Sequence, residues 1–176
     1  YNTLSNIIIE KSFEVMNNND KDFSINISYE DIFNHTLIQY IKNNLDKYPN
    51  IGGRLIIEIL ETELIEDMHV MNEFISDFKK YGVRIAIDDF GTGHSNFSNI
   101  LDLNPDYIKI DGSFIKNIHT DKISHSLVKG IIASAKELNI KTIAEFIHNK
   151  DVFDVTLKLG IDEFQGFYFS EPLIKP

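Results

Sequence analysis

Short apolar runs alternate with longer amphipathic stretches along this chain. The apolar runs have the length and composition of β-strands, and they occupy residues 23–27, 54–60, 83–87, 107–110, 141–144 and 164–169. The amphipathic stretches have the periodicity of helices, and they occupy residues 4–17, 29–45, 66–81, 95–101, 124–138 and 150–159. Strands that alternate with helices in this way predict an α/β fold, in which helices cover a parallel sheet.

The number of strand–helix units limits the architecture. An eight-unit barrel uses roughly 30 residues per unit, so six units need about 190 residues, which is close to the 176 of this chain. The run RLIIEIL suits a strand buried on both faces, while YPNIGG at 48–53 and NPD at 104–106 predict turns. We expect an incomplete TIM-like (β/α) barrel with about six of eight units, or alternatively a complete open sheet.

Polar side chains occupy corresponding positions at the ends of the predicted strands. They are Asn26 and Ser28, Glu58 and Glu61, Asp88 and Asp89, Lys109 and Asp111, Glu145, and Gln165. The carboxyl ends of parallel strands are where α/β sheets and barrels bind their ligands. The pattern therefore predicts that these groups converge on one site.

Asp88 and Asp89 end the third run and precede the turn sequence FGTG. Neighbours along a strand point in different directions, so two adjacent acids could serve two centres. Two cations about 3.5–4 Å apart can hold the attacking and leaving oxygens in phosphoryl transfer, and carboxylates suit magnesium or manganese. The alternative is that one aspartate caps the turn and the other is solvated.

Three residues of the first two strands are further candidates. A buried carboxylate is costly unless it is paired or metal-bound, so Glu58 in IIEIL is a candidate metal ligand, with a rim salt bridge as the alternative. Glu61 either supports the site or simply starts the next helix. Asn26 in SINIS offers a neutral oxygen ligand, or else is a hydrogen-bonded amide at a strand end.

Lys109 and Glu145 are the candidates for proton and phosphate chemistry. Lys109 in YIKID could orient a nucleophilic water or neutralise phosphate; alternatively it forms an ion pair with Asp111 or another acid. Glu145 in KTIAEF could take a proton from attacking water as a general base, or be a paired acid at a strand end.

The last strand and the segment before it carry weaker signals. Gln165 could satisfy backbone groups, and Gly166 is expected to admit close approach of another backbone segment. His148, taken alone, is expected to be structural or exposed rather than a ligand.

Charge and cysteine content narrow the function classes. A net charge of −10 argues against a DNA or RNA polymer or an anionic membrane as partner. A small phosphorylated ligand is still compatible, because bound cations can invert the field locally. The absence of cysteine excludes disulfides and thiolate zinc sites, and suits the cytoplasm. No apolar run approaches the roughly 20 residues of a membrane span, and no signal-peptide pattern opens the chain.

Six stretches of the chain resemble the EAL-domain family of cyclic di-GMP phosphodiesterases. They follow the family's order from Phe23 onward, and they are SINIS, IIEILETE, IAIDDFGTGHSNFSNI, PDYIKIDGSFI, KTIAEF and LGIDEFQGFYFSEPL. The resemblance implies a TIM-like barrel that opens cyclic di-GMP to the linear dinucleotide in bacterial second-messenger signalling. It also implies two divalent cations, usually Mg²⁺ or Mn²⁺.

The resemblance assigns a role to each candidate residue. Asn26, Glu58 and Asp88 are implied as metal ligands, and Asp89 as a ligand of the second metal. Lys109 is implied to hold the nucleophilic water, and Glu145 to be the general base. Glu61 is implied to brace the loop after DDFGTG, and Gln165 to line the site.

The chain departs from the family pattern in three places. The Glu-Ala-Leu motif is absent, so we expect residues 1–176 to be a single EAL-type domain that lacks its N-terminal part and one metal ligand. We therefore expect weak or no turnover from this chain alone. Leu60 replaces a threonine, and the family's E-G-V-E reads Glu145-Phe146-Ile147-His148. Our hypothesis is that His148 lowers the affinity for the second metal or shifts the preference towards manganese.

Two other functional interpretations stay open at this point. The first is a degenerate EAL module that acts as a cyclic di-GMP receptor or a protein-interaction scaffold. The second is an unrelated metal-dependent barrel enzyme, such as an enolisation catalyst with Lys109 as base. An incomplete barrel also has exposed edges, so a homodimer is expected. Other signalling domains are expected upstream in the parent protein.

Overall fold

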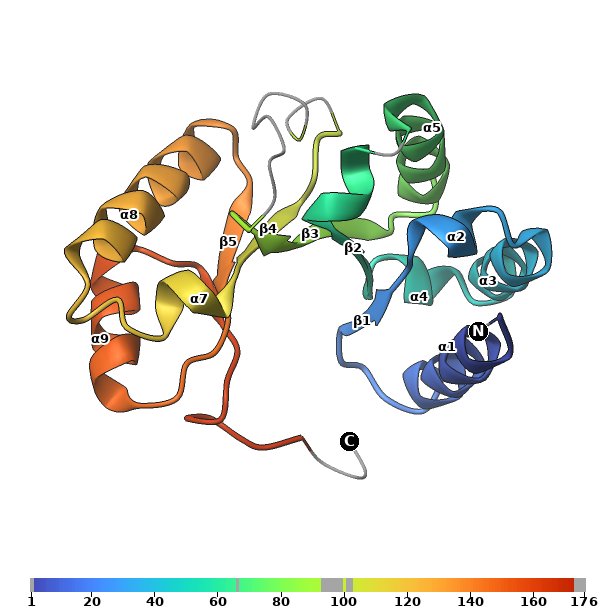
Figure 1. Cartoon of the computed structure of the whole chain (residues 1–176). Coiled ribbons are helices and arrows are strands. Elements are labelled where there is room, and N and C mark those ends of the chain that lie inside the picture. The colour runs from blue at the N-terminus through green and yellow to red at the C-terminus, as the bar shows by residue number, and fades with distance from the viewer. Residues whose placement is uncertain (1, 66, 93–99, 101–102, 173–176) are drawn as a thin grey trace. The chain divides into compact units, whose positions relative to one another are not determined.

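The computed structural model describes residues 2–65, 67–92, 100 and 103–172 (Figure 1). Its strands follow one another in the order β1-β2-β3-β4-β5-β6. The chain divides into two compact units, the first made of Tyr1–Ala86 with Ser95–Pro105 and the second of Ile87–His94 with Asp106–Pro176. The predicted helix at residues 95–101 lies almost wholly outside the described residues.

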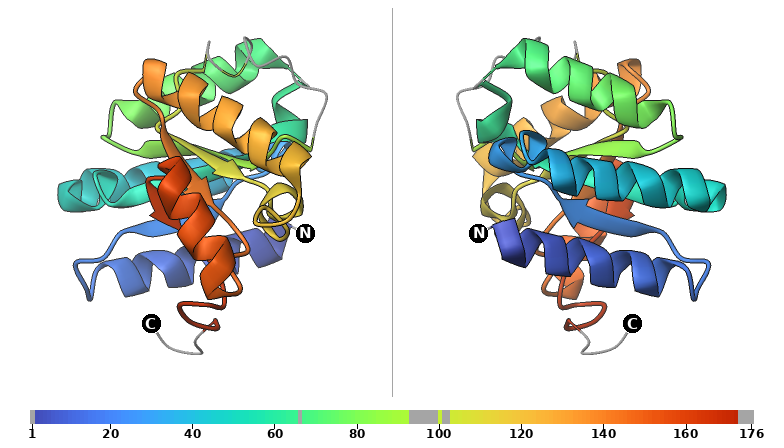
Figure 2. Two further views of the ribbon diagram at one scale, coloured as in Figure 1. Left: turned by 90° about the vertical axis from the view of Figure 1, so that its left-hand side faces the viewer. Right: turned by 90° about the vertical axis from the view of Figure 1, so that its right-hand side faces the viewer.

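The first unit contains two complete strands and the helices that cover them. Its elements are α1 (Asn2–Met16), β1 (Phe23–Asn26), α2 (Tyr29–Ile32), α3 (His35–Lys47), α4 (Pro49–Gly52), β2 (Leu55–Leu60), the 3₁₀ helix η1 (Glu61–Ile65), α5 (Met68–Lys79) and the start of β3 (Arg84–Phe90). β1 and β2 are parallel, and Asn26 pairs in register with Glu58. Helix α3 lies between α1 and α5 (Figure 2).

The second unit repeats the same alternation. Its elements are the end of β3, β4 (Tyr107–Ile110), α7 (Gly112–Ile115), α8 (Lys122–Glu137), β5 (Lys141–Ala144), α9 (Lys150–Leu159) and β6 (Glu163–Phe164). β5 pairs in parallel with both β4 and β6, and α8 and α9 lie side by side along it (Figures 1 and 2). Six strands with intervening helices confirm the predicted α/β class with six TIM-like units.

Local signals explain where the predicted helix boundaries were wrong. The single helix expected at 29–45 is two helices, because the Asn34 side chain accepts a hydrogen bond from the Leu37 backbone and begins α3 anew. The turn expected at 48–53 contains the short helix α4, with Pro49 in its first turn, where a proline's missing N–H costs nothing. Helix α9 matches its predicted bounds and ends at Gly160, whose φ of 89° is left-handed.

The last strand is shorter than predicted. β6 ends at Phe164, and the backbone turns after Gln165 instead of extending to residue 169. The cause is Gly166, with a φ of 155°, where a Cβ would lie 2.2 Å from the Ile147 carbonyl oxygen. The prediction that Gly166 admits close backbone approach is therefore confirmed. No described helix combines the length and the apolar character that crossing a membrane requires.

Candidate active site

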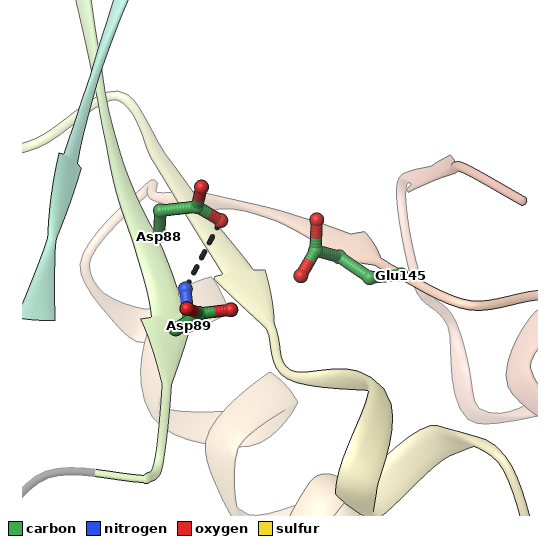
Figure 3. Close-up of side chains that lie close together, drawn as sticks. All are labelled: Asp88, Asp89 and Glu145. Carbon is green, nitrogen blue, oxygen red and sulfur yellow. Dashed lines mark hydrogen bonds between the residues drawn. The ribbon is translucent and has the colours of Figure 1, made fainter. Parts of the chain in front are cut away.

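The carboxyl end of β3 carries Asp88 and Asp89 beyond a fully buried apolar stretch. Asp89 has a φ of 52°, so the backbone leaves the extended conformation at this residue. The expected alternation of the two side chains fails for that reason. One ligand oxygen each of Asp88, Asp89 and Glu145 lie within 4.8 Å of one another, and the three carboxylates face a common space (Figure 3).

Lys109 connects this cluster from the neighbouring strand β4. Its Nζ donates to Asp88 Oδ1 at 2.8 Å and lies 3.0 Å from Glu145 Oε1. The lysine side chain is only 4% exposed, so its charge needs these partners. The ion pair named as the alternative interpretation of Lys109 thus exists, with Asp88 and Glu145 as partners. Asp111 instead accepts a hydrogen bond from Ser113 N at the start of α7.

The crowding of acids affects their protonation. Burial raises the pKa of Glu145, and the neighbouring Lys109 only partly opposes this effect. Burial also raises the pKa of Asp89, and the charges of Asp88 and Asp111 raise it further. Both carboxyl groups therefore hold a proton more readily than an isolated acid does, chiefly because burial disfavours the charged carboxylate.

A cavity of about 320 Å³ opens beside Glu145. It is lined by Asp111, Gly112, Glu145, Phe146, His148, Gln165, Gly166 and Phe167. Glu145, Gln165 and His148, three of the predicted site residues, therefore share one pocket. The His148 side chain is exposed, its Nδ1 lies 3.1 Å from the Phe146 carbonyl oxygen, and it is not a member of the carboxylate cluster.

Asn26, Glu58 and Glu61 belong to the first unit. Asn26 and Glu58 face one another as register partners at the carboxyl ends of β1 and β2. The Glu58 residue is 9% exposed and Glu61 is 2% exposed, so both residues are largely removed from solvent. Glu61 also begins η1, as the alternative interpretation expected. The functional roles of these three residues stay predictions.

Two site residues had not been assigned a role from the sequence. Asp111 was identified only as a strand-end acid, yet it lines the cavity and raises the pKa of Asp89. Its position directly after YIKI is the signal that could have found it. Phe146 also lines the cavity, with a φ of 55°. That conformation favours glycine, the residue that the resembling family has at this position.

The donor set of the cluster fits a hard divalent cation. Three converging carboxylates offer the oxygen ligands that bind magnesium or manganese. Among the described residues, no histidine joins this set. A cation bound here would also relieve the repulsion between Asp88 and Asp89.

The sequence of this chain matches a family model and several known proteins. The sequence model of the EAL domain matches residues 1–172. The chain is 37% identical over 162 residues to the cyclic di-GMP phosphodiesterase PdeA of Borreliella burgdorferi, covering 92% of this chain and 24% of that protein. It is 31% identical over 150 residues to the cyclic di-GMP phosphodiesterase PdeF of Escherichia coli, covering 85% of this chain and 20% of that protein. The chain therefore spans about a quarter or less of these relatives.

Solved structures of EAL proteins are similar in fold to this chain. Klebsiella pneumoniae BlrP1, in a manganese and cyclic di-GMP complex, matches with a TM-score of 0.79 and 27% identity, covering 86% of this chain and 39% of that one. The EAL domain of Mycobacterium smegmatis DcpA matches with a TM-score of 0.79 and 26% identity, covering 86% of this chain and 68% of that one.

Proposed function

Because the chain belongs to the EAL domain family, we propose that it hydrolyses cyclic di-GMP to the linear dinucleotide in a reaction that requires divalent metal ions. The observation that carries this proposal is the contact of Lys109 with both Asp88 and Glu145, beside Asp89. The relatives named as cyclic di-GMP phosphodiesterases support it. The activity of the whole protein is part of the proposal, since the chain spans only part of those relatives.

Asp88 and Asp89 are the proposed metal ligands of the second unit, and Asn26 and Glu58 are proposed metal ligands of the first unit. Mg²⁺ or Mn²⁺ suits oxygen ligands of this kind. The BlrP1 complex, which contains manganese, supports Mn²⁺. When bound, such ions would stabilise the charge that develops on the phosphate oxygens and lower the pKa of water.

Glu145 acts as the general base in this reaction. Its pKa is raised by burial, which brings it closer to the pH at which a base is most effective. Glu145 removes a proton from water, the water oxygen bonds to phosphorus, and the bond from phosphorus to one ribose oxygen breaks. That ribose oxygen then takes up a proton, which completes the linear dinucleotide.

Lys109 positions the attacking water and offsets negative charge. Its Nζ lies 3.0 Å from the Glu145 carboxylate, so a water held by this ammonium group is within reach of the base. The buried ion pair also fixes the Glu145 side chain, which must keep its place during proton transfer. Gln165 lines the adjacent cavity and contacts the bound nucleotide.

We place this activity in the bacterial cytoplasm, in a protein that carries further signalling domains and forms a homodimer. Cyclic di-GMP is the proposed small-molecule partner, and the solved complexes of related EAL proteins with cyclic di-GMP support it. The net charge of −10 disfavours a nucleic-acid polymer as partner.

Incubation with cyclic di-GMP and Mn²⁺, followed by chromatography of the linear dinucleotide, tests the proposal. We expect slow product formation that Glu145→Gln abolishes, because losing a general base typically costs about 10²–10⁴-fold. Glu163→Gln is the matched control, since Glu163 pairs with Lys141 on the surface, away from the cluster. Equal rates for parent and Glu145→Gln would refute the role of Glu145. Tight binding without any product would favour the receptor alternative.

A further inference from the structure

Phe146 is held in an unfavourable backbone conformation with its ring in solvent. Its φ of 55° is left-handed, which is a genuine outlier for a bulky residue. The residue is nevertheless 59% exposed, so burial of the ring does not offset this strain. Strain of this kind persists where the surroundings impose it, and it is concentrated at functional sites.

The surroundings of Phe146 leave room for it. A Cβ on Gly112 would lie 2.8 Å from the Phe146 Cβ, so only glycine at position 112 permits this arrangement. The His148 ring lies 5.6 Å from the Phe146 ring at an interplanar angle of 55°, and the Phe146 carbonyl oxygen lies 3.1 Å from His148 Nδ1. The ring therefore lies beside the cavity, next to the His148 ring.

A second exposed aromatic residue lines the same cavity. Phe167 is 68% exposed and follows Gly166, whose close approach to Ile147 fixes the turn. The cavity of about 320 Å³ lies at the lower end of the 300–1,000 Å³ range of small-molecule sites. It is therefore suited to one base of a dinucleotide rather than to the whole molecule, and Glu145 lies on its wall.

We propose that Phe146 is a specificity-determining residue whose ring stacks on a purine base of the bound nucleotide, with Phe167 as the second aromatic wall. This inference rests on the proposed function for its substrate, and it adds a base-binding subsite next to the reacting phosphate. Aromatic rings can stack on any base because every base has a π face, and differences in stacking strength give a modest preference among bases. This contact accounts for an exposed phenylalanine that keeps a left-handed backbone conformation beside Glu145.

Binding measured by titration calorimetry tests the subsite independently of turnover. The parent, Phe146→Leu and Phe146→Tyr are titrated with GMP, UMP and cyclic di-GMP in the presence of Ca²⁺. We expect GMP to bind the parent more tightly than UMP, and Phe146→Leu to weaken both guanine ligands about tenfold, within the 5- to 150-fold that stacking on one base typically contributes. Phe146→Tyr keeps a ring and is expected to bind like the parent. Phe33→Leu, an exposed phenylalanine of the first unit, is the control.

Phe146→Gly separates stacking from a structural role. Glycine accepts a φ of 55° without strain, so the thermal midpoint should stay equal or rise while GMP binding falls as in Phe146→Leu. Unchanged binding in Phe146→Leu and Phe146→Gly, or no GMP binding to the parent, would overturn the inference whatever the activity. Ring-dependent GMP binding without hydrolysis of cyclic di-GMP would uphold the subsite and refute the proposed function instead.

Discussion

Lys109 is the residue that joins the elements of the candidate site. It comes from the middle of β4, yet its Nζ contacts Asp88 at the end of β3 and Glu145 after β5. Sequence alone indicated that a lysine in an apolar strand needs an acid, and the structure identifies two. The choice between Asp111 and other acids was not predictable, because it depends on where strands β3 and β5 place their ends. Asp111 instead caps α7.

Replacing Lys109 should destabilise the protein more than replacing a surface lysine. Lys109→Met leaves Asp88 and Glu145 partly buried without their cation, and breaking a buried pair from one side costs about 3–5 kcal/mol. Both carboxylates retain some solvent contact, so we expect about 2–4 kcal/mol at neutral pH. Urea unfolding measures this difference. Lys141→Met, which removes an exposed partner of Glu163, should change stability by less than about 1 kcal/mol; equal losses in the two variants would contradict this account.

His148 lines the cavity beside Glu145 with an exposed imidazole side chain. A carboxylate at this position would bind a hard cation better than an imidazole does. We expect His148→Glu to lower the Mg²⁺ concentration that gives half-maximal hydrolysis, and to lower that for Mn²⁺ by a smaller factor. His119→Glu adds the same charge elsewhere in the second unit and serves as the control. Activity of His148→Glu no better than the parent at limiting magnesium would count against a metal role for this position.

At the scale of elements, strand positions were predicted better than the ends of helices. β4 and β5 match their predicted bounds because each is a compact apolar run, and all four residues of β4 are buried. The break between α2 and α3 depends on one side chain, Asn34, which caps a new helix. The early end of β6 depends on the contact of Gly166 with Ile147. Such contacts between segments distant in sequence leave only weak signals in a local pattern.

Helices α3 and α5 are joined by an ion pair whose contribution depends on pH. Asp77 of α5 accepts hydrogen bonds from Lys42 of α3 and from Lys80, which lower its pKa below the ordinary value of 3.8. The contribution of this ion pair to stability is therefore fully present above the ordinary pKa of 3.8, and it is lost as the pH falls through the lowered pKa of Asp77. We expect Asp77→Asn to cost roughly 0.5 kcal/mol at pH 7, as for other partly exposed pairs, and less at about pH 2, where Asp77 is more protonated.

The control for Asp77→Asn is Asp46→Asn, which changes the same residue type on an exposed position of α3. Chemical denaturation at both pH values, at low salt, gives the two differences. A loss of stability for Asp77→Asn that is the same at both pH values would show that packing, rather than the ion pair, joins these helices.

At the scale of the whole molecule, the distribution of charge predicts how the protein responds to cations. The chain carries a net charge of −10, and three of its acids converge beside a single buried lysine. The presence of these acids at strand ends was predictable from the sequence, because strand periodicity indicates which positions lie at that edge. The convergence of these acids in one unit was harder to predict, because a local pattern does not indicate the left-handed backbone conformation of Asp89.

Divalent cations should therefore stabilise the folded protein through this cluster. A ligand at a hundredfold its dissociation constant adds about 2.7 kcal/mol, which for a chain of this size corresponds to roughly 5–10 °C in the thermal midpoint. We expect Mn²⁺ to raise the midpoint in a concentration-dependent way, and EDTA to reverse the increase. Sodium chloride of equal ionic strength screens the surface charges without filling the cluster, so it should give a smaller change.

The variant Asp88→Asn decides whether the cluster or the overall charge is responsible for this stabilisation. Removing one carboxylate from three weakens a specific site strongly but changes the net charge of −10 by only one unit. The shift with Mn²⁺ should therefore be much smaller in Asp88→Asn than in the parent, whereas Asp154→Asn, which removes a surface acid paired with Lys150, should shift like the parent. Equal shifts in all three proteins would mean that cations act on the whole surface. Asp88 would then have no role as a metal ligand in this chain.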